Sequence, residues 1–326
     1  DLGIAAGSCE RLLVMRGGQC VEQGGVEQIY RAPRSSYTQD LLAAVPRLDD
    51  GRVRTPLGAA PPLLEISDLA VHYQVPAAGA AFGQQTLRAL DGVALRLAPG
   101  ETLGVVGESG CGKSTLARAI LRLVAPTHGR VCLLGAELAG LPEADVRPHR
   151  RDMQLVFQDP LAALDPRMTV RNIVAEPLEA FEAALGYAEV TARVGEALRQ
   201  VGLDPAWMNR YPHQFSGGQC QRIGIARALV LKPQLLVCDE AVSALDVAVQ
   251  MQILTLIREL QAEHRFGALF ISPDLGAVRR VADRVAVLFD RRVIVDTLEA
   301  ITANEHPWIR HYFHGGRGRA LRAAQE

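Results

Sequence analysis

The sequence lacks the cysteine spacings of metal and disulfide proteins. Six cysteines are scattered along the 326 residues, and no two of them form a CxxC pair. This scatter argues against a zinc site, an iron–sulfur cluster or a disulfide framework, and it favours the reducing cytosol as the compartment. The six are Cys9, Cys20, Cys111, Cys132, Cys220 and Cys238.

Long apolar runs are missing as well. No run approaches the roughly 18 apolar residues that a membrane span requires. The first residues do not have the charged and apolar regions of a signal peptide. If a membrane is involved, we therefore expect this chain to reach it through a partner.

An excess of charge of one sign is the third absence. Lys and Arg number 35 against 36 Asp and Glu, so the formal net charge is −1. No global field then favours nucleic acid or an anionic membrane. The basic clusters at Arg147–Arg151 and Arg317–Arg322 are interpreted as solvated faces. With 48% hydrophobic residues, the chain has enough apolar surface for one large globular domain plus an appendage.

The beginning of the chain resembles a stretch near its end. DLGIAAGSCERLLVMRGGQCV aligns with DLGAVRRVADRVAVLFDRRVI, which superposes Asp1 on Asp274 and Arg11 on Arg284. Each stretch has the pattern of an amphipathic helix, an acid–Arg pair, a β-rich run and a turn. We expect residues 1–46 to be the end of one domain and the rest to be a complete second copy, as in a fragment of a longer tandem protein. Chance similarity between two helix–strand units is the alternative.

Hydrophobic patterning predicts a mixed α/β domain after a linker. Residues 47–62 are rich in Pro, Gly and charge, which is typical of a linker. Strands followed by helices predict a parallel core sheet with an antiparallel layer on its N-terminal side. Strands are expected at residues 63–75, 89–97 and 101–106, and helices at residues 188–201 and 249–263.

The strongest chemical motif is VVGESGCGKSTLARAI, residues 105–120. Its glycines allow the loop to curl so that successive N–H groups point at one anion, and the following helix adds its positive N-terminus. Lys113 can reach the β and γ phosphates of a nucleotide, and the Ser114 hydroxyl suits Mg²⁺. A glycine turn that merely joins a strand to a helix is the alternative. The predicted phosphate-loop residues are Gly107, Glu108, Ser109, Gly110, Cys111, Gly112, Lys113, Ser114 and Thr115.

Two acids follow a second apolar strand in QLLVCDEAVSALD. The strand at residues 235–238 delivers Asp239 toward the metal and Glu240 toward the attacking water. We predict that Asp239 positions the metal and that Glu240 is the general base. Two acids that simply cap a strand end are the alternative for this pair taken alone.

A third motif narrows the class of NTPase. In YPHQFSGGQCQRIGIARAL, the four residues Ser216, Gly217, Gly218 and Gln219 precede a helix. With FQDPLAALDPRMTVRNIVAEPL at residues 157–178 and CDEAVSALDV at residues 238–247, the chain resembles the ATP-binding cassette family. It particularly resembles the second ATPase subunit of bacterial oligopeptide and dipeptide importers, or the C-terminal half of a fused double cassette. The segment VEQGGVEQIYRAPRSSYTQDLLAAVP resembles the tail that such subunits carry after the cassette.

The resemblance implies the fold and the domains. It implies an α/β P-loop NTPase (RecA-like) core with an antiparallel β subdomain and an α-helical signature subdomain. The cassette would span residues 63–300, with its helical part at about 160–232, and residues 301–326 would be a tail. Residues 1–46 would be the C-terminal remnant of a preceding cassette.

The resemblance also implies roles for single residues. Gln158 would approach the metal and the attacking water, so that Ser114, Gln158 and Asp239 would hold Mg²⁺. The signature Ser216–Gln219 and the D-loop residue Asp246 would act on the ATP site of a partner cassette. Tyr73 would stack on adenine, although an ordinary strand aromatic is the alternative.

The implied partners are a second ATP-binding cassette, transmembrane permease subunits and, indirectly, a periplasmic or extracellular solute-binding protein, with no nucleic acid. ATP and Mg²⁺ are the implied cofactors. The implied location is the cytoplasmic face of the bacterial inner membrane, as a peripheral subunit. A soluble cassette ATPase without a transport role is an alternative, although the long coiled-coil or basic insertions of such proteins are missing.

Two departures from the family bear on function. No cysteine follows Cys238, so we expect no iron–sulfur cluster, and the tail at residues 303–320 is similar to ATPases of lipid-trafficking importers, which leaves the substrate open. Pro273 stands where the family has a histidine that holds the γ-phosphate and the attacking water. Loss of such a donor costs on the order of 2–4 kcal/mol, so a cassette impaired in hydrolysis is a further alternative.

Cys111 carries a separate prediction. It lies in the phosphate loop, near Lys113 and the start of a helix, where a thiolate is favoured. An inert small residue is the alternative at this position.

Overall fold

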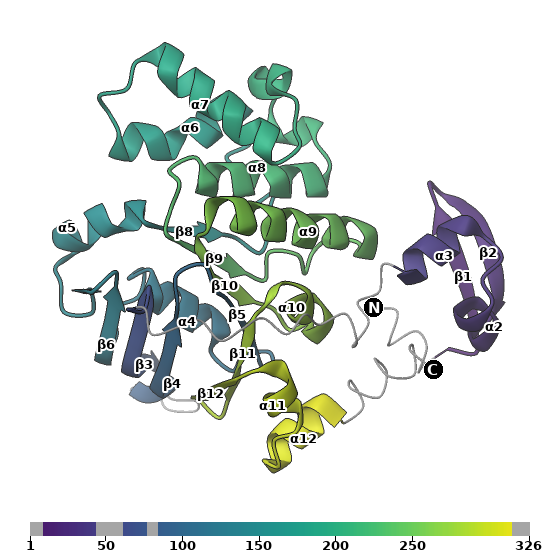
Figure 1. The fold of residues 1–326 in the computed structure, drawn as a ribbon, viewed down its shortest axis with the longest axis horizontal. Helices are drawn as coiled ribbons and strands as arrows, with labels where there is room; N and C mark the ends of the chain where they lie inside the picture. The colour runs from purple at the N-terminus through teal and green to yellow at the C-terminus, as the bar shows by residue number, and fades with distance from the viewer. Residues whose placement is uncertain (1–8, 44–60, 77–83, 315–326) are drawn as a thin grey trace.

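The computed structural model describes residues 9–43, 61–76 and 84–314. Asp1, nearly all of the predicted linker at 47–62 and the end of the predicted tail lie outside the described residues. Within them, the chain forms a central sheet, a smaller antiparallel sheet, a group of helices and a separate N-terminal hairpin unit (Figure 1).

The central sheet has six strands in the order β12-β11-β5-β10-β9-β8. All neighbours are parallel except β12, which pairs antiparallel with β11 at one edge. The inner strands are buried along their length because both faces of the sheet are covered, as parallel sheets require. The strands are β5 (Thr102–Val106), β8 (Met153–Val156), β9 (Leu235–Asp239), β10 (Gly267–Ile271), β11 (Arg284–Phe289) and β12 (Arg292–Asp296).

An antiparallel sheet in the order β4-β3-β6-β7 covers one side of this core. Its apolar side chains share a buried cluster with residues of β5 and α4. The expected antiparallel layer is confirmed, although the second strand begins five residues before the predicted position 89. The strands are β3 (Leu64–Pro76), β4 (Gln84–Leu97), β6 (His128–Leu133) and β7 (Ala136–Glu137).

Helices complete the core and form the helical group at the top of Figure 1. The predicted helices at 188–201 and 249–263 are confirmed within two residues at each end. Around the core lie α4 (Lys113–Ile120), α5 (Glu143–Val146), η1 (Arg147–Arg151), α9 (Val247–His264), α10 (Leu275–Val281), α11 (Leu298–Thr302) and α12 (Pro307–His314). The helical group contains α6 (Val170–Phe181), α7 (Tyr187–Gln200), η2 (Pro205–Asn209), η3 (Pro212–Gln214) and α8 (Gly217–Leu229).

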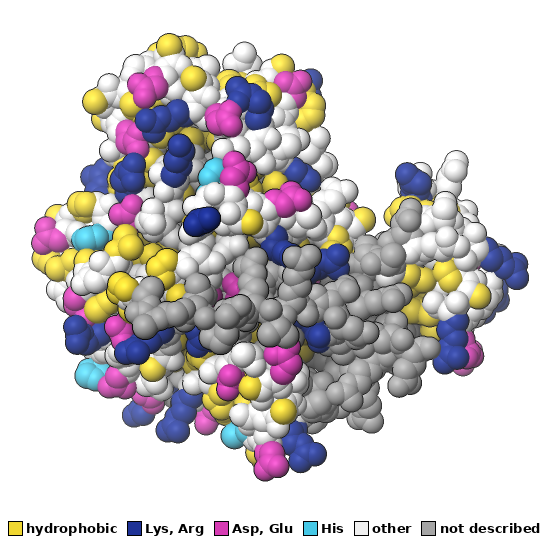
Figure 2. Space-filling view, viewed as in Figure 1, with side chains coloured by type: hydrophobic (Ala, Val, Ile, Leu, Met, Phe, Trp, Pro, Cys, Tyr) yellow, Lys and Arg dark blue, Asp and Glu magenta, His cyan; other side chains and the backbone are white. Residues whose placement is uncertain are grey.

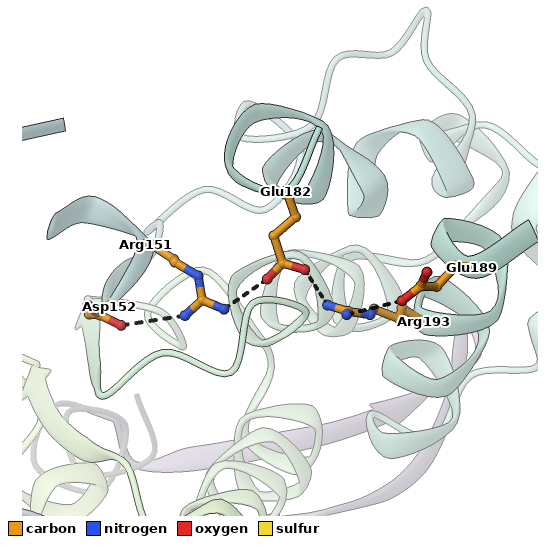
Figure 3. Close-up of polar contacts among 5 residues, drawn as sticks. All are labelled: Arg151, Asp152, Glu182, Glu189 and Arg193. Carbon is orange, nitrogen blue, oxygen red and sulfur yellow. Dashed lines mark hydrogen bonds and ion pairs between the residues drawn. The ribbon is translucent and has the colours of Figure 1, made fainter. Parts of the chain in front are cut away.

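The helical group joins the core through a shared apolar cluster and an ion-pair chain. Glu182, just after α6, accepts from Arg151 at 2.8 Å and from Arg193 of α7 at 2.5 Å (Figure 3). Burial alone would raise the pKa of Glu182, but the two guanidinium groups outweigh it and hold the pKa below its usual value. Arg151 ends the short helix that leads into β8, so the chain of charges spans the two parts.

The N-terminal hairpin unit repeats the arrangement at the C-terminal side of the core. It consists of β1 (Arg11–Arg16), β2 (Gln19–Gly25), α2 (Val26–Arg31) and α3 (Ser36–Ala43). β1 and β11 begin at residues that the sequence alignment superposes, and so do β2 and β12. Each hairpin is antiparallel and is followed by two short helices.

Candidate functional site

The predicted phosphate loop lies between β5 and α4. Gly110 and Gly112 have φ angles of 80° and 109°, which only glycine adopts without strain. A Cβ on Gly112 would also lie 2.6 Å from the carbonyl oxygen of Ala89, and a Cβ on Gly107 would overlap the carbonyl oxygen of Leu288. The backbone can therefore follow this path only with glycine at these positions.

Lys113 is folded over the loop. Its Nζ donates to the carbonyl oxygens of Gly107 at 3.0 Å and Glu108 at 2.8 Å, and the residue is 5% exposed. Glu108, Ser109 and Gly110 are exposed, whereas Ser114 and Thr115 follow in the first turn of α4. These two carbonyl groups thus hold the Lys113 ammonium group against the loop that is predicted to bind phosphate.

Ser114 and Asp239 meet although they are distant in sequence. The Ser114 hydroxyl donates to Oδ1 of Asp239 at 3.1 Å. Burial raises the pKa of Asp239, while the Ser114 hydroxyl, Arg118 and Lys113 oppose this shift. A hydroxyl and a carboxylate oxygen are donors that suit a hard divalent cation.

Gln158 and Glu240 form a second pair at the same edge of the sheet. Nε2 of Gln158 donates to Oε2 of Glu240 at 3.0 Å. The backbone of Glu240 has a φ of 50°, a left-handed conformation that is uncommon for residues other than glycine. Its N–H donates to the carbonyl oxygen of Ile271 in β10 at 2.9 Å, which fixes the turn after β9. Backbone strain of this kind is frequent at functional sites.

Pro273 follows β10, the strand between β5 and β9. It is exposed, and its neighbour Ser272 is 1% exposed. The Ser272 hydroxyl oxygen accepts from the N–H of Asp274 at 3.1 Å, and Asp274 caps α10 by accepting from Gly276 N at 2.8 Å. Pro273 itself has neither a side-chain donor nor an N–H to offer a phosphate.

The predicted signature begins α8. The Ser216 hydroxyl oxygen accepts from Gln219 N at 3.3 Å, and Oε1 of Gln219 accepts from Ser216 N at 2.9 Å, which is a capping box. Ser216 and Gly217 are exposed at this helix N-terminus. Within the described ranges, no hydrogen bond joins the signature to the phosphate loop of the same chain.

The signature helix packs closely on α9. A Cβ on Gly218 would overlap Cγ1 of Val249. Val249 N donates in turn to Oδ1 of Asp246 at 3.0 Å, so the predicted D-loop aspartate caps α9. The signature and the D-loop therefore lie on two helices that contact each other.

Two further sequence predictions concern Tyr73 and Cys111, which both pack against the same apolar cluster. Tyr73 is half-buried on β3 and packs against the apolar cluster that includes β5 and α4. The favoured thiolate at Cys111 is wrong for this structure. Burial raises the pKa of Cys111, and the nearby Lys113, with Nζ 4.0 Å from Sγ, only partly opposes it. The charge of Lys113 can be read from the sequence, whereas the burial of the Cys111 thiol depends on the fold.

Arg227 is a residue of the site region that the sequence reasoning missed. It lies on α8, and its Nη1 donates to the carbonyl oxygen of Ala163 at 2.8 Å. Its guanidinium carbon lies 5.6 Å from the centre of the Phe157 ring, which is close enough for a cation–π contact. Arg227 thus connects the signature helix to the segment after β8. The signal in the sequence that could have indicated this contact is that Arg227 lies among apolar residues of the helix.

Comparisons with known proteins agree with this geometry. The family model described as ABC transporter matches residues 90–243. The oligopeptide transport ATP-binding protein OppF of Escherichia coli K12 is 52% identical over 252 residues, which are 76% of this chain and 75% of that protein. The ATP-binding cassette MJ0796, solved as a dimer in a post-hydrolysis state with ADP and Pi, is 29% identical with a TM-score of 0.64, over 72% of this chain and 98% of that one.

The chain belongs to the ATP-binding cassette transporter family. The predicted α/β P-loop NTPase fold, the ATP-binding function and the ATPase class are confirmed on this basis. The glutathione import ATP-binding protein GsiA of Salmonella typhimurium is also similar, at 42% identity over 338 residues, which cover 95% of this chain and 54% of that protein. Among the described residues, no helix is both long and apolar enough to cross a membrane.

Proposed function

We propose that this chain is the ATP-hydrolysing subunit of an importer for peptides or similar small solutes. The observation that carries the proposal is the convergence of the Lys113 loop, the Ser114–Asp239 pair and the Gln158–Glu240 pair at the carboxyl edge of one parallel sheet. The similarity to oligopeptide and glutathione import proteins supports the substrate class.

Phosphate binding follows from the loop and the helix behind it. The N–H groups of residues 107–115 and the positive end of α4 suit the phosphates of ATP. Lys113 would exchange its two carbonyl acceptors for phosphate oxygens, with a gain because charge-assisted hydrogen bonds are stronger. Tyr73, on the rim of the same cluster, is the candidate for stacking on adenine.

The residues present fit a magnesium ion. Within the described part of the chain, no group of three or more His, Cys, Asp or Glu side chains could hold a metal alone. Mg²⁺ does not need such a cage, because it keeps waters and binds phosphates together with a few protein oxygens, of which only one or two come from carboxylates. Ser114, Asp239 and Gln158 would supply those oxygens, and the ion would neutralise charge that develops on the phosphates.

Glu240 and Gln158 are proposed to act on water. Glu240 would accept a proton from the attacking water as a general base. Its position is defined by the backbone bond to Ile271, and Gln158 contacts its carboxylate. Gln158 would orient the same water.

The partners follow from the exposed signature. Ser216 and Gly217 are exposed at a helix N-terminus, which suits the γ-phosphate held by a second cassette packed head to tail. ATP would then join two cassettes, and hydrolysis would release them. Permease subunits would receive this motion at the cytoplasmic face of the membrane, with a solute-binding protein outside. On the face shown in Figure 2, acidic and basic side chains are interspersed, so this face carries no broad basic surface of the kind that nucleic acid favours.

The domain assignment is part of the proposal. Residues 63–300 form the cassette, with its helical part at about 160–232, and residues 301–326 form its tail. Residues 1–46 belong to a preceding cassette and 47–62 link the two. The repeated hairpin and helix order of the described parts supports this division.

A second candidate function is a cassette that binds ATP but hydrolyses it slowly. The exposed Pro273 favours it, because the end of β10 offers no donor there. The ATPase assay of the assembled complex separates the two candidates. For the proposed importer ATPase, Lys113→Ala should reduce turnover strongly while co-purification with the permease is kept. Turnover that survives Lys113→Ala but requires the lysine of the partner cassette would favour the second candidate. Failure to co-purify with any permease would contradict the transport role.

A further inference from the structure

The N-terminal hairpin unit leaves one strand uncovered within the described residues. β1 has β2 as its only neighbour there, and Leu13 and Met15 are 54% and 53% exposed. A strand with an open edge and apolar side chains is a site where another strand can pair. Figure 2 shows hydrophobic side chains on the visible face of this unit, at the right.

The equivalent strand β11 shows what covers such a surface. β11 lies between β12 and β5 and pairs parallel to β5 from Arg284 to Val287. Ala286 and Leu288 are superposed on Leu13 and Met15 by the sequence alignment, and both are 0% exposed. They pack in the cluster between the central and the antiparallel sheets. The same positions are therefore core in one hairpin and surface in the other.

The acid and the arginine at the start of the strand match in the two hairpins as well. In the complete copy, Nη1 of Arg284 donates to Oε1 of Glu101 at 3.0 Å, and the Glu101 side chain is only 1% exposed. Oδ2 of Asp283 accepts from the N–H of Thr102, the first residue of β5, at 2.8 Å. In the N-terminal unit the corresponding acid and arginine are Glu10 and Arg11, and both are exposed.

A complementary surface would thus have three properties. It would offer a strand that pairs in parallel with β1, a glutamate directly before that strand, and a free N–H at its first residue. The phosphate-loop strand of a cassette has all three, as β5 of this chain shows.

We propose that residues 9–43 close the core sheet of another ATP-binding cassette, which precedes this one in the same polypeptide. The phosphate-loop strand of that cassette pairs with β1 as β5 pairs with β11. This chain does not provide the occupant, because β5 already has β10 and β11 on its two edges. The chain spans 54% of the glutathione import relative, a length that leaves room for a second cassette.

The inference rests on the internal repeat and deepens the domain assignment. It does not depend on hydrolysis at Lys113. ATPase activity measured on the same samples therefore distinguishes a failure of this inference from a failure of the proposed function.

Site-specific photo-crosslinking tests the proposal in the intact polypeptide purified from its source cells. Leu13 is replaced by p-benzoylphenylalanine, and the control carries the same probe at Leu134, an equally exposed leucine at 53%. The expected link from position 13 is to a peptide that contains a glycine-rich phosphate loop and that is not part of residues 61–314. Links to this chain, to a second copy of it, or to a peptide without such a loop would overturn the proposal. Absence of a link would overturn it too.

Hydrogen–deuterium exchange provides an independent reading without substitution. The amides of β1 should exchange several-fold more slowly in the intact polypeptide than in the isolated 326-residue chain. The amides of β11 serve as the internal control, because β5 covers that strand in both samples. Equal exchange of β1 in the two samples would contradict the pairing.

Discussion

The contact between the signature helix and α9 can be tested with one methyl group. In the variant Gly218→Ala, the new Cβ would overlap Cγ1 of Val249. Val249 cannot yield freely, because a valine in a helix has one strongly preferred χ1 rotamer and its backbone N–H is held by Asp246 at the start of α9. Relief therefore requires α8 to shift against α9, and overpacking of this kind costs about 1–3 kcal/mol.

Gly217→Ala is the matched control. A Cβ at Gly217 would meet Cδ2 of Leu245 at 3.8 Å, an ordinary van der Waals distance. The gain in helix propensity from glycine to alanine is common to both variants, so it cancels in their comparison. The free energy of unfolding should thus be lower for Gly218→Ala than for Gly217→Ala by about 1–3 kcal/mol.

Urea unfolding monitored by circular dichroism measures the difference, provided that the m-values agree. The double variant Gly218→Ala with Val249→Ala should recover at least about 0.5 kcal/mol relative to the sum of the single effects. Equal midpoints for the two glycine variants, or strict additivity with Val249→Ala, would refute the claimed overlap.

Three further predictions concern charge, thiols and hydrolysis. Glu182→Gln should lower the free energy of unfolding at pH 7 by about 1 kcal/mol. Burial opposes the shift, but the two arginine partners lower the pKa of Glu182. The difference in the free energy of unfolding between the wild type and Glu182→Gln, measured by urea unfolding at a series of pH values, should therefore decrease as the pH drops below the ordinary pKa of 4.5. Maleimide should label the exposed Cys9 faster than Cys111 and should leave the buried Cys238 unlabelled in the folded chain. The reason is that burial raises the pKa of the Cys111 thiol and raises the pKa of Cys238 to about 12. ATP should slow the labelling of Cys111, and equal labelling with and without ATP would argue against a position of Cys111 at the nucleotide. For the second candidate function, Pro273→His should increase the ATPase rate at the Lys113 site of the assembled complex by about a hundredfold, whereas an unchanged rate would contradict that candidate.

Local patterns explain why the geometry of the predicted phosphate loop could be expected from the sequence. Glycines with positive φ, a lysine and a helix start are neighbours in sequence, so their spacing alone predicts their geometry. The same holds for Ser216 and Gln219, whose capping box needs only one helical turn. The positions of these motifs follow from short-range sterics and hydrogen bonding.

Pairs that depend on strand order could not be placed from the sequence alone. Gln158 and Glu240 are 82 residues apart and meet because β8 and β9 are neighbours in the sheet. Neither segment has a sequence pattern that predicts which strand lies beside it, since parallel strands are joined by long connections. The resemblance to a family assigned roles to both residues, but the contact itself comes from the fold.

Burial was the other missing information. The sequence placed Cys111 beside a lysine and a helix start, and both favour a thiolate. The structure adds the desolvation, which raises the pKa of the thiol beyond what Lys113 compensates. Arg227 escaped notice for a related reason, because its acceptor on Ala163 belongs to a segment 64 residues away.

The place of Pro273 in the strand order allows a sharper expectation for the site. The groups proposed for binding, Lys113 with the Ser114–Asp239 pair, follow β5 and β9, and Pro273 follows β10 between them. None of their hydrogen bonds involves Pro273, so a missing donor there should leave ATP affinity nearly unchanged. It would act only on the transition state, where charge develops on the γ-phosphate. We therefore expect Pro273→His to alter kcat while the Kd for ATP stays constant, and a change in Kd alone would place the proline in the binding step instead.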